Sequence, residues 1–188
     1  MKAAQVWMLT GERGAGKTSL CRALAARAQE SGWDAAGVTS PGVFESGVKT
    51  GILVEDVRRG ERHLLAALEA RDPFDLPVGK WYFDRAMLAW GDQVIANSPP
   101  CDLLIVDELG PLELLQRGGW QSALPVLHGE SGRLALVVIR PELQALAQEM
   151  LNISAVLTVD QSKSLEQWVH LVWARIEALF GGIIRSAK

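Results

Sequence analysis

The decisive stretch of this sequence is Gly11-Glu12-Arg13-Gly14-Ala15-Gly16-Lys17-Thr18, which fits the phosphate-binding loop pattern G-x-x-x-x-G-K-[ST] at every fixed position. Its glycines let the backbone adopt positive φ and bring successive N–H groups close to an anion. We expect the lysine to add a charge for the β- and γ-phosphates, and the threonine to offer a hydroxyl to Mg²⁺. The residues expected to bind a nucleotide by its phosphates are Gly11, Glu12, Arg13, Gly14, Ala15, Gly16, Lys17, Thr18 and Ser19.

The segments on either side of this loop fit that role. Residues 5–9 form a short apolar run, which suits a buried parallel strand, and residues 19–28 are rich in strong helix formers. The helix would then begin under the phosphates, where its dipole favours negative charge. An ordinary strand-to-helix turn is the alternative, and the combination of motif and setting favours the nucleotide loop.

Composition limits the classes of protein to consider. The 188 residues are enough for one domain with a full-sized core, and 48% of them are hydrophobic. The net charge of −3 and the pI near 5.6 give no general basic field for duplex nucleic acid. No export signal and no stretch of the ~20 apolar residues that span a bilayer is evident. We therefore expect a cytoplasmic protein without a membrane or duplex partner, in which Cys21 and Cys101 are reduced structural thiols.

Apolar runs and helix-forming segments alternate along the chain, which is typical of βαβ units in a parallel sheet. Strands are expected at 5–9, 35–39, 103–106, 133–139 and 153–159. Helices are expected at 19–28, 83–97, 141–151 and 163–181, with a shorter one at 120–128 interrupted by Pro125. This pattern predicts an α/β fold, a P-loop NTPase three-layer sandwich with a mostly parallel sheet, as a single domain over residues 1–188.

A β-hairpin insertion is expected at about residues 42–70. Its arms are residues 48–57 and 61–68, which flank a charged turn, and a loop with two prolines is expected over 71–80. Trp81 and Trp120 sit near predicted loops and could meet a nucleotide base, although packing in the core is the interpretation that we prefer.

The second motif of the predicted site follows another buried strand. Residues 103–106 form a continuous apolar run that delivers Asp107 and Glu108 at its end, where ligands bind in open α/β sheets. We expect Asp107 to hold Mg²⁺ together with Thr18, directly or through water. Glu108 can accept a hydrogen bond from a water aligned with the γ-phosphorus, which hydrolysis needs and simple binding does not. A polar helix cap or a surface turn is the alternative for this Asp-Glu pair.

Three further charged residues are candidates by position. Arg140 closes the next strand and should emerge at the same edge as the phosphate loop, within range of a γ-phosphate, while a surface arginine is the alternative. With Lys17 and Glu108 it completes the predicted catalytic set. Glu45 and Lys49 could close over the nucleotide, whereas solvated loop charges are the interpretation that we favour for them.

Taken together, these residues resemble the small P-loop nucleoside triphosphatases first described from hyperthermophiles and also found in animals. The most specific likeness is at residues 106–114, V-D-E-L-G-P-L-E-L, against the family signature V-I-D-E-I-G-x-M-E-L. Residues 11–20 are similar to its nucleotide loop, and 36–40 with 43–52 to its strand and Gly-rich hairpin. Residues 78–81, V-G-K-W, resemble the family element V-G-K-Y.

The resemblance implies an additional-strand P-loop fold, related to recombinase and AAA-type ATPase cores. It also implies Mg²⁺-dependent conversion of nucleoside triphosphates to diphosphates and phosphate, with loose base selectivity. The family hairpin reads V-R-E-G-G-K-R, whereas residues 43–49 here read V-F-E-S-G-V-K, so that Phe44 replaces the first arginine and Lys49 keeps a charge at the second. If either arginine assists turnover in the family, we expect hydrolysis here to be slower or to depend on a partner.

The leading prediction is therefore a Mg²⁺-dependent triphosphatase acting on ATP, GTP and further nucleotides. Two alternatives stay open. One is an ATP-dependent kinase of a small metabolite, because the phosphate loop is shared and a carboxylate can equally activate an acceptor hydroxyl. The other is a slow nucleotide switch or accessory factor that serves a protein partner, to which Phe44 in a predicted loop gives some weight.

Overall fold

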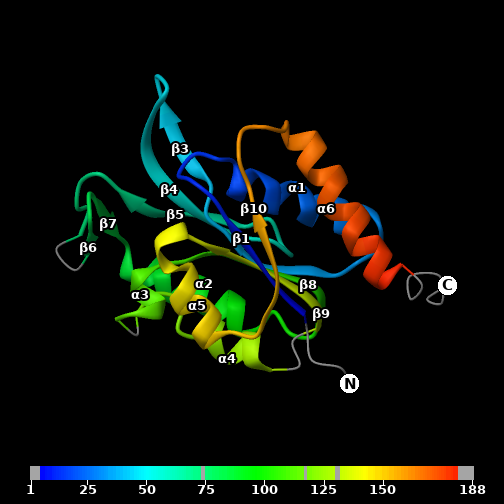
Figure 1. Cartoon of the computed structure of the whole chain (residues 1–188). Coiled ribbons are helices and arrows are strands. Elements are labelled where there is room, and N and C mark those ends of the chain that lie inside the picture. The colour runs from blue at the N-terminus through cyan, green and yellow to red at the C-terminus, as the bar shows by residue number, and fades with distance from the viewer. Residues whose placement is uncertain (1–4, 73–74, 117, 130–131, 182–188) are drawn as a thin grey trace.

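The computed structural model of the protein describes residues 5–72, 75–116, 118–129 and 132–181 (Figure 1). Short strands follow one another between Gly42 and Phe83, and elsewhere strands alternate with single helices or pairs of helices. The elements in chain order are β1 (Gln5–Thr10), α1 (Lys17–Glu30), β2 (Ala35–Thr39), β3 (Gly42–Glu45), β4 (Val48–Asp56), β5 (Arg62–Ala67), β6 (Leu76–Val78), β7 (Trp81–Phe83), α2 (Arg85–Ala96), β8 (Cys101–Leu109), α3 (Pro111–Leu114), α4 (Ala123–His128), β9 (Gly132–Ile139), the 3₁₀ helix η1 (Pro141–Leu143), α5 (Gln144–Met150), β10 (Ile153–Thr158) and α6 (Leu165–Phe180).

One sheet of ten strands runs through the described part of the molecule. Its order is β10-β1-β9-β8-β2-β4-β5-β7-β6, and β3 pairs with β4 beside this path. The first five strands in this order are parallel, and the others extend the sheet by antiparallel pairing. The carboxyl ends of the parallel strands therefore meet at one edge of the sheet, where α/β proteins place their ligands.

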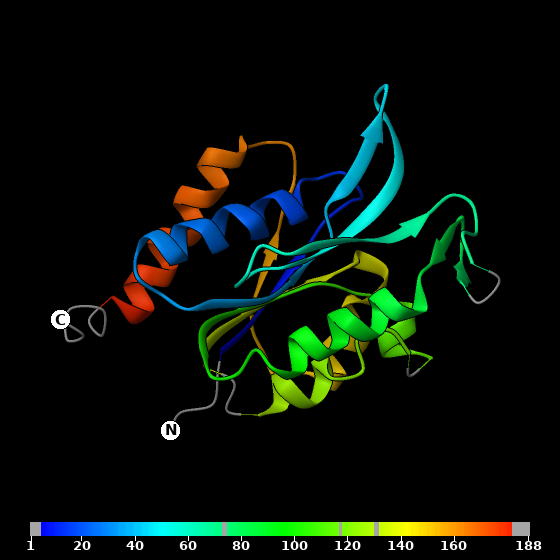
Figure 2. The same ribbon diagram turned by 180° about the vertical axis from the view of Figure 1, so that it is seen from behind.

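Helices cover both faces of the parallel strands, so the molecule has three layers (Figures 1 and 2). One face carries α1 and α6, and the other carries α2, α4 and α5. In β1, Val6 and Met8 face the second group of helices, whereas Trp7 and Leu9 face the first. Strands buried on both faces read as continuous apolar runs. The predicted three-layer α/β fold with a mostly parallel sheet is confirmed.

The antiparallel half contains more structure than the sequence predicts. A loop is expected over residues 71–80, but Leu76–Val78 forms β6 and pairs with β7. Pro77 is tolerated there because β6 is the last strand of the sheet, where no neighbour needs the missing N–H. Residues 42–45, expected as a Gly-rich loop, form β3. Antiparallel pairing thus runs on to Phe83, beyond the hairpin region predicted at about 42–70.

Local sequence signals explain where helices begin. The Asp84 carboxylate accepts the backbone N–H groups of Ala86 (2.8 Å) and Met87 (3.1 Å) and so caps α2. The sequence predicts that Pro125 interrupts its helix. Instead, Pro125 lies in the first turn of α4, where a proline fits, and α4 continues past it. At the C-terminus α6 spans 165–180 within the predicted 163–181, and Ser164 caps it. None of the helices in the described ranges is long and apolar enough to cross a membrane.

Helix α2 packs closely against the indole of Trp120. A Cβ atom added at Gly91 would lie 2.4 Å from Cζ3 and 2.6 Å from Cη2 of that ring. Trp120 is only 3% exposed, so the ring is enclosed by the core and meets no ligand. The packing role preferred for Trp120 is therefore confirmed, and Gly91 is required for this contact.

We expect Gly91→Ala to lower the free energy of unfolding by about 1–3 kcal/mol, because the added methyl overpacks a filled core. Helix propensity alone would make the same change favourable by about 1 kcal/mol. Urea unfolding of this variant in wild-type and Trp120→Phe backgrounds measures the effect, since phenylalanine lacks the two crowded ring atoms. The destabilisation should shrink in the Trp120→Phe background. An equal loss in both would show that another contact is responsible.

Candidate active site

The phosphate loop connects β1 to α1 at the carboxyl edge of the parallel strands (Figure 1). Gly11, Gly14 and Gly16 all have positive φ, of 135°, 83° and 94°. A Cβ at Gly11 would lie 2.1 Å from the carbonyl oxygen of Val159, so the loop can pass this neighbouring backbone only as glycine. The path of the loop is thus fixed by its glycines, as the motif predicts.

The start of α1 is left open to an anion. Its N-cap is Gly16, which has no side chain to satisfy the first N–H groups of the helix. The ammonium of Lys17 folds back over the loop, where it donates to the carbonyls of Gly11 (2.5 Å) and Glu12 (2.9 Å). Lys17 is 9% exposed. Unpaired N–H groups and a sheltered ammonium converge here, which is the arrangement that a phosphate group requires.

Asp107 lies inside β8 and is almost fully buried, at 1% exposure. Its Oδ1 accepts the hydroxyl of Thr18 (3.3 Å), and its Oδ2 accepts the backbone N–H of Ser40 (3.0 Å). Burial raises the pKa of Asp107 to about 6, and Glu108 adds to this, while the hydrogen bonds from Ser40 and Thr18 and the charge of Lys17 oppose it. The protein therefore keeps a carboxylate here against an electrostatic penalty.

The donors at this point fit a magnesium ion. The Thr18 hydroxyl and the Asp107 carboxylate are hard oxygen ligands in contact with each other, and Mg²⁺ prefers such oxygens while keeping several waters. Elsewhere in the described ranges, no group of three or more His, Cys, Asp or Glu side chains could hold a metal. Two protein oxygens, completed by phosphates and water, suit a magnesium nucleotide better than a resident metal cage.

Glu108 and Arg140 meet at the same edge. Arg140 directly follows β9, the neighbour of β8, and its Nε donates to Oε1 of Glu108 in an ion pair. Both side chains are partly exposed, at 29% for Glu108 and 37% for Arg140. A surface arginine was the alternative for Arg140. The side chain is partly exposed, but its guanidinium is paired with Glu108 of the acidic pair and is therefore not a solvated surface charge alone.

The structure thus brings Lys17, Thr18, Asp107, Glu108 and Arg140 to one edge of the sheet. The other residues predicted to bind the nucleotide lie in the phosphate loop itself or in the first turn of α1. Glu12, Arg13 and Gly14 are exposed on its outer side, Ala15 and Gly16 are partly buried, and Ser19 is exposed on the first turn of α1.

Ser40 is a residue of this site that the sequence analysis did not single out. Besides donating its N–H to the Asp107 side chain, it donates its hydroxyl to the Asp107 backbone carbonyl (2.5 Å). It follows β2, which lies beside β8 in the sheet. A polar residue directly after a predicted strand was the available signal, but strand order is needed to place it next to Asp107.

Lys49 also lies closer to the site than expected. It is partly buried, and burial lowers the pKa of its ammonium, while the negative charges of Asp107 and Glu108 act in the opposite direction. The interpretation of Lys49 as a solvated loop charge is wrong for this reason. Glu45, in contrast, is exposed near the tip of the β3–β4 hairpin, as expected.

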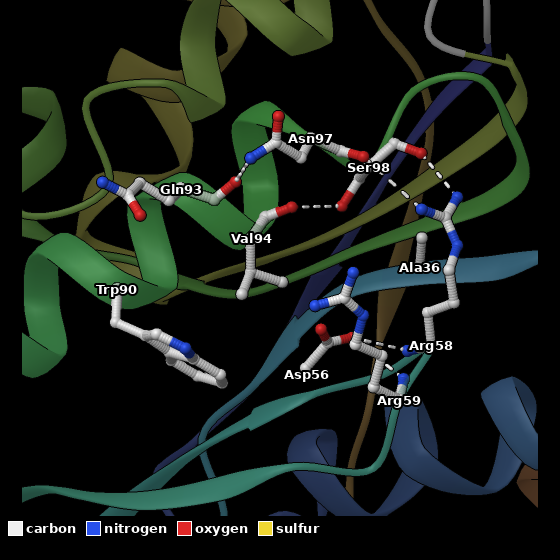
Figure 3. A pocket seen from close by; sticks show the side chains of 9 residues that line it. All are labelled: Ala36, Asp56, Arg58, Arg59, Trp90, Gln93, Val94, Asn97 and Ser98. Carbon is white, nitrogen blue, oxygen red and sulfur yellow. Dashed lines mark hydrogen bonds between the residues drawn. The ribbon is translucent and has the colours of Figure 1, made fainter.

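A separate pocket of about 200 Å³ lies between α2 and the turn that follows β4 (Figure 3). Arg58 spans one side of it, with two hydrogen bonds to Asp34 and one to the carbonyl of Ser98 (2.6 Å). Ala36, near the start of β2, also lines it, which places the pocket toward the edge of the sheet opposite the phosphate loop. Its polar groups tie the end of α2 to the sheet and do not extend the site.

A three-layer α/β fold, a glycine-rich phosphate loop and an acidic pair near the carboxyl end of β8 define a P-loop NTPase. A model of the NTPase family matches residues 6–167. The chain belongs to this family.

Named relatives agree with this assignment. The chain is 35% identical over 133 residues to the nucleoside-triphosphatase THEP1 of Ignicoccus hospitalis, covering 70% of this chain and 75% of that protein. It is 27% identical over 155 residues to the THEP1 of Methanosarcina acetivorans, covering 81% and 86%.

Two solved structures share the fold. The solution structure of a human cancer-related nucleoside triphosphatase superimposes with a TM-score of 0.67 at 23% identity, over 99% of this chain and all of that one. The crystal structure of THEP1 from Aquifex aeolicus gives 0.56 at 17%, over 89% and 98%. The implied P-loop fold is therefore confirmed by structure as well as by sequence.

The raised pKa of Asp107 predicts how stability depends on pH without metal. Between the ordinary value of 3.8 and about 6, the folded state binds the proton that the unfolded state has lost, so the free energy of unfolding rises as pH falls through this window. Above pH 6 the buried charge of Asp107 lowers the free energy of unfolding by about 1–3 kcal/mol. With EDTA present, the isosteric Asp107→Asn should therefore unfold at higher temperature than wild type at pH 7.5, and the gap should narrow toward pH 4. A constant gap would contradict the assigned pKa.

Proposed function

We propose that this chain is a Mg²⁺-dependent nucleoside triphosphatase, which converts a nucleoside triphosphate and water into a diphosphate and phosphate. The observation that supports it most is the contact between Thr18 and Asp107 beside Glu108, at the mouth of the phosphate loop. The name nucleoside-triphosphatase, carried by the relatives, agrees with this activity. Cys21 and Cys101 are buried thiols, which agrees with a protein of a reducing compartment such as the cytoplasm.

In this proposal the chain binds the triphosphate through the open N–H groups of the loop and α1, and through Lys17. Thr18 and Asp107 hold Mg²⁺, which when bound offsets charge on the β- and γ-phosphates. Glu108 accepts a hydrogen bond from the attacking water and orients its oxygen toward the γ-phosphorus. Arg140 keeps the Glu108 carboxylate in place through their ion pair, and we expect its guanidinium to act on the γ-phosphate from the same edge.

The bonds exchanged are few. The water oxygen forms a bond to the γ-phosphorus as the bond to the β,γ-bridging oxygen breaks, and the diphosphate leaves with the electron pair. Glu108 assists the departure of the water proton to solvent. None of these contacts is to the nucleobase, so we expect several nucleotides, ATP and GTP among them, to be substrates.

Release of phosphate from ATP, GTP, CTP and UTP, with and without Mg²⁺, tests the activity. We expect Glu108→Gln to bind nucleotide as wild type does but to turn over ~100-fold more slowly, because it loses the water-orienting carboxylate. Lys17→Ala should lose tight triphosphate binding. Glu166→Gln, at an exposed position in the first turn of α6, is the matched control and should behave as wild type.

Other outcomes would redirect the assignment. Undiminished turnover by Glu108→Gln would remove its role in positioning water. Transfer of phosphate to an added small-molecule hydroxyl faster than to water would support a kinase, the first alternative from the sequence. Tight binding with almost no release by the wild type would support a switch that waits for a protein partner.

A further inference from the structure

Two antiparallel hairpins, β3–β4 and β6–β7, belong to the half of the sheet beyond β2. The β3–β4 hairpin stands over the loop between β1 and α1 in both views (Figures 1 and 2). The β6–β7 hairpin contributes Lys80 from its turn and Trp81 from the start of β7. The ammonium of Lys49, from β4, lies 5.6 Å from the centroid of the Trp81 ring, and that of Lys80 lies 5.0 Å from it. One indole therefore joins lysines from both hairpins.

The direction of Lys49 follows from strand pairing. Lys49 stands directly opposite Phe44 in the β3–β4 pair, so the two side chains share one face of the hairpin. The side chains of Lys49 and Phe44 pack against the backbone of β3 at residue 42, which is possible because this residue is glycine. A Cβ at Gly42 would lie 2.8 Å from Cε of Lys49 and 2.8 Å from Cε2 of Phe44. The aliphatic part of the Lys49 side chain therefore packs over β3 and is partly buried, which limits the positions that its ammonium can take.

The charges around Lys49 are those of the active site. Asp107 and Glu108 attract its ammonium, whereas Arg13 of the phosphate loop and Lys80 repel it. Within the described ranges, the ammonium of Lys49 has no hydrogen bond and no ion pair, and it lies over the Trp81 ring. A cation held partly out of water beside two carboxylates, with its three donors unused, is available for an anionic ligand.

Two of the other cations at this edge already have partners in the protein. Lys17 donates to the carbonyls of Gly11 and Glu12, and Arg140 donates to Glu108. Phosphoryl transfer spreads negative charge over the equatorial γ-oxygens, and a cation aimed at them lowers the barrier most when it is preorganised. Lys49 is carried by β4, which lies on the other side of β8 from β1 in the order of the sheet.

We propose that Lys49 is a catalytic residue of this protein, whose ammonium contacts the γ-phosphate and stabilises the charge of the transition state, with Trp81 as its positioning residue. The protein thereby supplies its own cationic finger from the β3–β4 hairpin, without a partner. This inference rests on the proposed hydrolysis. Lys49 stays protonated throughout, so the bonds and protons exchanged are those already given.

Steady-state phosphate release and nucleotide affinity separate this role from simple binding. We expect Lys49→Met to lower kcat by ~100-fold, the typical loss of one transition-state donor. Its affinity for Mg²⁺·ADP, which lacks the γ-phosphate, should change less than threefold, while affinity for Mg²⁺·ADP with aluminium fluoride should fall in parallel with kcat. Lys49→Arg should recover most of the loss. Lys163→Met is the matched control, because it removes another lysine that lies 4.9 Å from a tryptophan centroid, that of Trp168.

The role of Trp81 is tested by coupling. Trp81→Leu should lower kcat less than Lys49→Met does, and should add nothing in the Lys49→Met background, since the indole acts through the ammonium. Additive losses in the double variant would overturn the positioning role. Thermal unfolding of each variant confirms that the fold is retained.

The inference and the proposed function fail in different ways. If wild type turns over and Lys49→Met matches it, the proposed function stands and the finger is overturned. Equal losses of ADP affinity and kcat in Lys49→Met would also overturn it, because they would show that Lys49 does not act through the γ-phosphate. A failure of Lys49→Arg to recover activity would show that charge is not what Lys49 contributes. If wild type releases no phosphate, both the proposed function and this inference fall.

Discussion

The burial of the Asp107 carboxylate is the constraint on which the site depends. The charge lies at the end of a hydrophobic strand, where desolvation raises its pKa, and it is tolerated because Thr18 and Ser40 donate to its two oxygens. Those donors come from α1 and from the segment after β2, so three elements converge on one side chain. A divalent cation bound there would remove the remaining penalty, and binding would stabilise the folded state.

A second buried carboxylate anchors the antiparallel half to the phosphate loop. Glu55, on β4, is 8% exposed and pairs with Arg22 of α1 (2.9 Å) and Arg62 of β5 (2.8 Å), while Thr39 donates to it (3.2 Å). The base of the β3–β4 hairpin is therefore fixed to the helix that follows the loop. Nearer the tip, Phe44 is 62% exposed.

Periodicity and motif spacing were sufficient for the parallel half of the fold. Runs such as 103–106 are apolar because both faces are covered, and this made the strand before Asp107 visible in the sequence. The antiparallel half was harder, because Pro77 argues against a strand unless the strand is known to be an edge. Ser40 was not singled out, and a solvated charge was favoured for Lys49, for a related reason. Their neighbours, Asp107 and Trp81, are distant in sequence and are brought close only by strand order.

The distribution of charge explains how a protein of net charge −3 can attract an anionic substrate. Arg13, Lys17, Lys49, Lys80 and Arg140 gather around Asp107 and Glu108, an excess of three positive charges at one edge of the sheet. A nucleoside triphosphate that carries Mg²⁺ has a charge of about −2, so its entry nearly neutralises this edge. Each bound phosphate also relieves the repulsion between Lys49 and its cationic neighbours. The substrate thus completes an electrostatic arrangement that the protein alone leaves unbalanced.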